Sequence, residues 1–313
     1  MIHALTNRLL LSIPVLIGAL VFGFLLIKMA PGDPAQVMAG PSATPDIVAE
    51  IRREMGLDKP VLTQLGLYAA RLAQGDWGRS LISNKTVLSE LGAAFGPTVE
   101  LMFASMVWSV PLGVGLGTLA AVKRGSWIDR AIMAVSVAGV SLPIFFIALV
   151  LMQFLGVTLR LLPFMGRGGP LWSVDGLRHI AIPALSLGLI FIGPVARMTR
   201  SSVLEVLRLD HVRTARAKGL SETRVILRHA LRNALIPVVT LIGLQAGYLL
   251  GGAVVTETIF SYPGIGRLAV GAILSSDFPL AQGAILLLAL GFIGINMLVD
   301  MLYAVLDPRS HKA

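Results

Sequence analysis

Long apolar runs, each able to cross a lipid bilayer as a helix, constrain the fold of this chain more than any other feature. The first run, Leu9–Met29, has 21 residues, and about 20 helical residues span the hydrocarbon core of a membrane. The chain is 55% hydrophobic and only 14% charged, which disfavours a water-soluble globule. We predict an all-α polytopic membrane protein with six transmembrane helices: Leu9–Met29, Val99–Val122, Ala131–Leu155, Ile180–Ala196, Leu235–Val255 and Ala284–Leu306.

The first apolar run could also be a cleaved signal peptide, but two features favour a retained helix. Its apolar part is longer than a signal-peptide core. The helix-breaking sequence PGDP at 31–34 follows it, in place of a small-residue cleavage site. We therefore expect Leu9–Met29 to remain as the first transmembrane helix.

Residues 31–97 are too polar to lie within the membrane. They carry six lysines and arginines against seven acids, and Pro45–Gly56 and Pro60–Gln74 have the caps and periodicity of amphipathic helices. We therefore divide the chain into three parts. Residues 1–97 hold the first helix and an extracytoplasmic excursion, residues 98–306 hold a five-helix core, and residues 307–313 are a cytoplasmic tail.

The positive charges predict the orientation, because lysine and arginine are enriched in short cytoplasmic loops. Nine of them fall between residues 197 and 234, whereas the two short loops on the opposite side hold four. Both termini and the 197–234 loop are therefore predicted to be cytoplasmic, and the 31–97 excursion is predicted to lie outside. Membrane orientation also explains the net charge of +9 better than nucleic-acid binding does.

No catalytic or metal-binding pattern is apparent in the sequence. The chain has no cysteine, its five histidines are scattered without an HExxH pair, and it has no phosphate-binding GxxxxGK loop. We expect no enzymatic activity, no cofactor and no metal. Energy for uphill transport would come from a partner protein or from an ion gradient.

Three acids lie in apolar surroundings, where a charge is expensive and usually functional. We expect Glu100 to cap the start of the second span, and Asp300 to pair with a basic group near the inner end of the last span. Glu257 lies at the outer end of the fifth span, and we assign it, with Pro263 and Gly264, to a possible gate or outer vestibule. No series of acids crosses the membrane, which disfavours a proton-driven carrier.

Glycines recur within the predicted spans. Small residues let helices approach closely in lipid, where no hydrophobic drive brings helices together. We interpret these glycines as packing sites: Gly113, Gly115, Gly117, Gly243, Gly247, Gly251, Gly252, Gly291 and Gly294.

Residues 210–237 form a polar, helix-patterned segment within the apolar second half. Gly219 divides this segment, because glycine enters left-handed backbone geometry without a steric penalty. We predict a helix over Ser201–Lys218, a sharp turn, and a second helix capped by Ser221. Two stripes share the second helix, a cationic one of Arg224, Arg228 and Arg232 and an apolar one of Leu227, Ala230, Leu231 and Ala234.

The same pattern would suit a helix lying on anionic lipid head groups. A rigid helix, turn and helix projecting into the cytosol is better suited to docking on a protein. We therefore predict that residues 210–237 form a protein-docking segment.

Five sequence stretches resemble one family along the whole chain. They are DHVRTARAKGLS at 210–221, HALRNALIP at 229–237, MAPGDPA at 29–35, ETIFSYPGIGR at 257–267 and DMLYAVLDPR at 300–309. The first two look like the cytoplasmic coupling loop of ABC importer permeases of the dipeptide, oligopeptide and nickel class. Arg213, Thr214 and Ala215 stand where the general permease pattern has Glu-Ala-Ala, and Gly219 keeps its place.

The resemblance implies a type I ABC importer permease fold and a place in the bacterial inner membrane. The implied partners are a second homologous permease, two cytoplasmic ATPase subunits, an extracytoplasmic solute-binding protein and membrane lipid. Di- or oligopeptides are the expected substrates, with nickel, glutathione or another small solute as alternatives. A stand-alone channel or secondary carrier is the alternative from a different class. The residues that would contact an ATPase are Asp210, Arg213, Thr214, Ala215, Lys218, Gly219 and Leu220.

Overall fold

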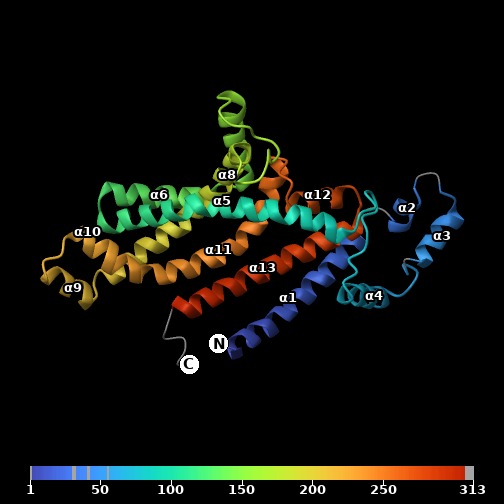
Figure 1. Ribbon diagram of the computed structural model, residues 1–313, viewed down its shortest axis with the longest axis horizontal. Helices are drawn as coiled ribbons and strands as arrows, with labels where there is room; N and C mark the ends of the chain where they lie inside the picture. Colours follow the sequence, from blue (N-terminus) through green and yellow to red (C-terminus); the bar gives the residue numbers. More distant parts are fainter. Residues whose placement is uncertain (1, 30–32, 41–42, 55, 307–313) are drawn as a thin grey trace. The chain divides into compact units, whose positions relative to one another are not determined.

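A computed structural model describes residues 2–29, 33–40, 43–54 and 56–306, and its regular structure in these ranges is helical (Figure 1). One isolated antiparallel bridge joins Arg79 and Thr86. The predicted all-α class is therefore confirmed for the described residues. The predicted tail, residues 307–313, lies outside them.

The elements are α1 (Ile2–Met29), α2 (Pro34–Ala39), α3 (Pro45–Glu54), α4 (Val61–Ala73), α5 (Val87–Val122), α6 (Trp127–Ser141), α7 (Ile144–Leu151), η1 (Met152–Thr158), α8 (Val174–Val206), α9 (Asp210–Ala217), α10 (Glu222–Arg224), η2 (Val225–Ala230), α11 (Leu231–Ile259), α12 (Ile265–Leu274) and α13 (Phe278–Leu306).

Four helical stretches are long and apolar enough to cross a membrane: Val87–Val122, Val174–Val206, Glu222–Ile259 and Phe278–Val299. A fifth span results if the bent pair Trp127–Ser141 and Ile144–Thr158 is counted as one. The side chains of α1 are described for Ser12–Leu25, and this stretch is apolar. The described chain thus has four or five spans by length and composition, consistent with a protein that crosses the membrane several times.

The third predicted span is not a continuous helix. It breaks between Ser141 and Ile144, where the two halves are bent by 101°. A residue before proline is pushed out of the helical region by the proline ring, and Leu142, which precedes Pro143, has extended backbone angles of φ −85° and ψ 130°. The helix therefore ends there and restarts as α7 after Pro143.

The second span begins at Val87 rather than near Val99. Pro97, which the predicted division placed before the span, lies inside α5. A proline inside a helix leaves the carbonyl four residues earlier without its backbone donor, here the carbonyl of Ala93, and α5 nevertheless continues through Pro97. The neighbouring Thr98 hydroxyl donates to the Ala94 carbonyl oxygen at 3.4 Å.

The two amphipathic helices predicted in the excursion are confirmed. α3 and α4 lie within one to two residues of the predicted Pro45–Gly56 and Pro60–Gln74. Gly56 follows α3 with φ 67°, and the Gln64 side chain donates to the carbonyls of Leu57 and Lys59 at 2.9 and 2.7 Å. These contacts fix the turn between the two helices.

The chain forms two compact units. One consists of Val99–Tyr262 and the C-terminal part from Phe292, and the other of Ile2–Thr98 and Pro263–Gly291. The second unit has its own core, in which Val87 and Leu91 of α5 pack with Ile265 of α12 and Ala284 of α13. The first unit holds the cytoplasmic loop predicted at 197–234 and has a separate core around it.

Candidate coupling region

The polar segment after α8 folds into a short helix, a tight turn and a second helical stretch, and it joins α8 to α11 (Figure 1). The predicted single helix over Ser201–Lys218 is wrong. α8 ends at Val206, and α9 starts only after Leu209, which has extended backbone angles. The break separates α9 from the membrane-spanning helix before it.

The turn after α9 has the hydrogen bonds of a Schellman motif, in which a left-handed residue ends the helix and satisfies its last carbonyls. Gly219 has φ 78°, its N–H donates to Arg216 O at 2.9 Å, and the Leu220 N–H donates to Ala215 O at 3.4 Å. Gly219 was predicted for this role. Ser221 also sits at its predicted N-cap position, although its side chain makes no cap bond to α10.

α9 is fixed to the rest of its unit by its apolar face. Val212 is fully buried and Ala215 is 5% exposed. They pack with Val203 and Val206 of α8, and Leu220 is half-buried against the same cluster, which also contains Ala121, Val225, Ala230 and Ala234. Two of the seven predicted contact residues, Ala215 and Leu220, therefore hold the helix in place.

The other five predicted residues form the exposed side of α9 and its turn. Asp210 and Arg213 make a loose ion pair at 3.7 Å, with side chains 96% and 73% exposed. Thr214, Lys218 and Gly219 are also exposed. A solvated, rigidly held polar face of this kind is available to a partner protein.

An ion pair that the sequence analysis missed closes the turn. Arg216 Nε and Nη2 lie 2.7 and 3.3 Å from the two carboxylate oxygens of Glu222. The hydrogen bonds to Glu222 raise the pKa of Arg216. The pair is exposed, so it contributes little to stability, but it bridges α9 and α10 across Gly219. Only the turn geometry brings residues six apart together, which is why helical periodicity gave no sign of it.

The second helical stretch differs from the prediction in its register. Residues Val225–Ala230 form a π-helical segment, in which each turn holds more residues than in an α-helix. Leu227, which was assigned to the apolar stripe, is 58% exposed, and Val225 is buried. Arg224, Arg228 and Arg232 are exposed as predicted.

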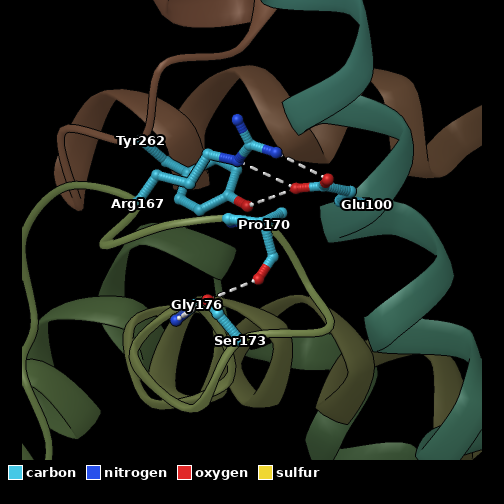
Figure 2. A network of polar contacts seen from close by, with 6 residues as sticks. All are labelled: Glu100, Arg167, Pro170, Ser173, Gly176 and Tyr262. Carbon is cyan, nitrogen blue, oxygen red and sulfur yellow. Dashed lines mark hydrogen bonds and ion pairs between the residues drawn. The ribbon is translucent and has the colours of Figure 1, made fainter.

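A second polar network, formed by Glu100 of α5, Arg167 and Tyr262, lies in the same unit (Figure 2). Arg167, in the loop before α8, binds both carboxylate oxygens of Glu100 through Nε at 2.9 Å and Nη2 at 2.6 Å. Burial raises the pKa of Tyr262 above its ordinary value, and the Glu100 charge adds to that shift. The phenol therefore stays protonated and donates to Glu100 Oε2 at 3.4 Å.

Glu100 was predicted to cap a helix, and this prediction is wrong. Because α5 begins at Val87, Glu100 lies well inside it and pairs with a loop far along the chain. The loop is held further by three hydrogen bonds. The Gly166 N–H donates to Phe260 O at 2.9 Å. The Ser173 hydroxyl donates to Pro170 O at 2.8 Å and accepts from the Gly176 N–H at 3.0 Å (Figure 2).

Comparison with protein families identifies the chain. Residues 113–312 match the family described as "Binding-protein-dependent transport system inner membrane component", and residues 1–116 match the N-terminal model of the same kind of membrane component. The chain belongs to this family. It is the permease subunit of an ABC importer, as the sequence resemblance implied.

Two curated relatives illustrate how close the permease is to known members. It is 44% identical over 308 residues to the "Glutathione transport system permease protein GsiC" of Salmonella typhimurium (strain LT2) and of Escherichia coli (strain K12), covering 98% of both chains in each case. With its several apolar spans, the permease is a multi-pass protein of the bacterial inner membrane.

Among solved structures, the permease has the fold of a chain in the inward-facing MetNI methionine ABC transporter. The TM-score is 0.59 at 17% sequence identity, over 70% of this chain and 96% of that one. This similarity concerns the fold alone.

The residues predicted for an outer gate fall in both units of the permease. Glu257, near the end of α11, is fully buried in the first unit. Pro263 is exposed in the second unit, and Gly264 is buried there as the N-cap of α12. The Ile265 N–H that follows donates to the Thr98 hydroxyl at 2.9 Å. The side chain of Asp300, predicted to pair with a base, lies outside the described side chains.

Proposed function

We propose that α9 and the Gly219 turn are the element through which a cytoplasmic ATPase drives this permease. The observation that carries the proposal is the two-sided construction of α9. Its apolar side, with Val212 and Ala215, packs against Val203 and Val206 of α8, and its polar side, with Asp210 and Arg213, is exposed and can meet a partner. The match of 210–221 to the coupling loop of the family supports the same assignment.

The topology that fits this proposal has six spans, with α1 as the first and the bent pair α6 and α7 as the third. Both termini and α9 are then cytoplasmic. α2, α3 and α4 lie outside, where a solute-binding protein would release its bound solute to the permease. Two permeases would enclose the pathway, and two ATPase subunits would hydrolyse ATP. Closure of the ATPase pair on ATP would move α9 and switch the helices between inward-open and outward-open states, a rigid-body transition biased by nucleotide.

The proposed substrate is a short peptide. The relatives named above are glutathione permeases, glutathione is a tripeptide, and the sequence resemblance is to the peptide class. Uptake of labelled glutathione, a dipeptide, a tripeptide and nickel, compared in cells with and without the permease, tests this assignment. We expect a peptide signal that depends on the permease, and nickel uptake alone would overturn the substrate class.

Gly219 provides the test of the coupling role. A β-branched residue at φ 78° is strongly disfavoured, whereas asparagine tolerates this conformation. A Cβ added there would have no atom within 4 Å of it outside the neighbouring residues, so the effect expected of a substitution is backbone strain. We expect Gly219→Val to lose uptake and ATPase stimulation while inserting normally in the membrane, and Gly219→Asn, the matched control, to keep both. Wild-type uptake and stimulation in Gly219→Val would refute the coupling role.

A further inference from the structure

One buried ion pair links the helix that leads into the coupling region to a different membrane helix. Asp129 lies in the first turn of α6, and Arg200 lies near the end of α8. Arg200 Nε and Nη2 bind Asp129 Oδ1 and Oδ2 at 2.6 and 2.8 Å. The Asp129 side chain is 5% exposed and that of Arg200 is 27% exposed. Charge-assisted bidentate pairs of this kind are directional and strong.

The simplest role for Asp129 is local capping, and the structure shows that it does cap. Its backbone N–H donates to the N-cap hydroxyl of Ser126 at 3.3 Å, and its Oδ2 accepts from the Gly125 N–H at 3.0 Å. These bonds lie within four residues of Asp129 and would fix the turn by themselves. Capping does not require an arginine 71 residues away that takes both carboxylate oxygens.

The helices beside the pair are in backbone contact. A Cβ added at Gly117 of α5 would lie 2.4 Å from Ala196 O and 2.7 Å from Thr199 Cβ, both in α8. A Cβ added at Gly193 of α8 would lie 2.4 Å from Ser136 O in α6. Such approaches are possible only at glycine. The cytoplasmic half of α8 is therefore interlocked with α5 and with α6, and the ion pair closes this arrangement at the end nearest α9.

The helix that carries Arg200 is in contact with α9. Beyond Arg200, α8 continues to Val206, and Val203 and Val206 pack against Val212 and Ala215 of α9. A displacement of α9 would therefore act on the end of α8, which the ion pair connects to the start of α6.

We propose that the Asp129–Arg200 pair is a tie that makes α6 move together with α8 when the coupling region is displaced. Asp129 and Arg200 are positioning residues for transport, and neither needs to touch the solute or the ATPase. This role rests on the proposed function of α9, and the tie itself can be tested without that function.

The first experiment measures the tie directly. The chain has no cysteine, so Trp127→Cys in α6 and Glu205→Cys in α8, both exposed positions, place one spin label on each of the two tied helices in the full-length permease in nanodiscs. We expect one narrow distance distribution in the parent and a broadened one in Asp129→Asn. Lys123→Gln, which removes an exposed charge from the same turn, is the control and should leave the distribution narrow. An unchanged distribution in Asp129→Asn overturns the tie, whatever α9 does.

The second experiment measures coupling in the complete transporter. We expect Asp129→Asn to lower the solute imported per ATP hydrolysed by about tenfold, within the usual range of coupling between sites. The double variant Asp129→Asn with Arg200→Gln leaves no unpaired charge at this site. We expect it to reach normal abundance in the membrane, while the solute imported per ATP hydrolysed stays low. If abundance and ratio recover together, the pair is only structural and the proposal fails.

A third variant keeps the proposal testable if Asp129→Asn and the double variant insert poorly in the membrane. Arg200→Lys keeps the charge but cannot bind both oxygens, and we expect a reduced ratio at normal abundance. A normal ratio in this variant together with an unchanged label distance counts against the tie. A normal ratio together with a broadened label distance would keep the tie as a structural contact but refute its role in coupling, whereas the coupling role of α9 is refuted separately by normal uptake in Gly219→Val.

Discussion

Thr199 in α8 is fully buried, and its hydroxyl oxygen has no hydrogen-bond partner among the described residues. Serine and threonine in helices commonly donate to the carbonyl four residues earlier, as Ser105 and Ser109 do in α5. A buried hydroxyl without a partner carries an uncompensated desolvation penalty of about 1–3 kcal/mol. Close packing against Gly117 thus outweighs hydrogen bonding at this position.

Replacing this hydroxyl should therefore not harm the permease. Valine has almost the shape of threonine without the polar atom, so we expect Thr199→Val to keep or raise the apparent melting temperature of the purified protein. Ser105→Ala, which removes a satisfied buried hydroxyl, is the comparison and should lower it. A clear fall in Thr199→Val would mean that the hydroxyl has a partner that matters.

At the scale of helices, glycine spacing alone did not distinguish packing sites from free ones. Gly113 and Gly117 of α5 both lie against α8, with added Cβ atoms 2.9 Å or less from it. Gly115, between them, has nothing within 4 Å. The difference arises because two positions on a helix separated by four residues share a face, and a residue midway between them does not.

This contrast predicts opposite outcomes for the same substitution in one helix. Gly117→Ala must push the α8 backbone away and should reduce thermal stability and membrane abundance. Gly115→Ala should be neutral or stabilising, since alanine favours a helix by about 1 kcal/mol over glycine. Thermal unfolding of the two purified variants, side by side, checks the prediction. Equal stability would show that α5 and α8 can separate without cost.

At the scale of the whole molecule, the proposed topology separates two exposed positions by the membrane. Leu62 in α4 is 81% exposed, and Thr214 in α9 is also exposed. In intact cells or spheroplasts a membrane-impermeant thiol reagent should label Leu62→Cys only. In inverted vesicles it should label Thr214→Cys only. Labelling of both from one side would rule out the proposed arrangement of six spans.

The sequence alone determined those features of the protein that depend on residues close together in the chain. Apolar runs of bilayer length gave the class, the caps and periodicity of α3 and α4 gave their positions, and Gly219 gave the turn after α9 because a left-handed helix end strongly favours glycine. The motifs of the coupling loop gave the family. Each of these signals lies within a short stretch of chain.

Only the tertiary structure decided which distant groups meet. Arg167 and Glu100 are 67 residues apart in the sequence, and Arg200 and Asp129 are 71 apart. No spacing pattern in the sequence predicts either pair. The continuation of α5 through Pro97 and the π segment that leaves Leu227 exposed were likewise not indicated by local spacing. The reason is physical: a buried charge needs a partner, and in a bundle of helices three-dimensional packing selects that partner.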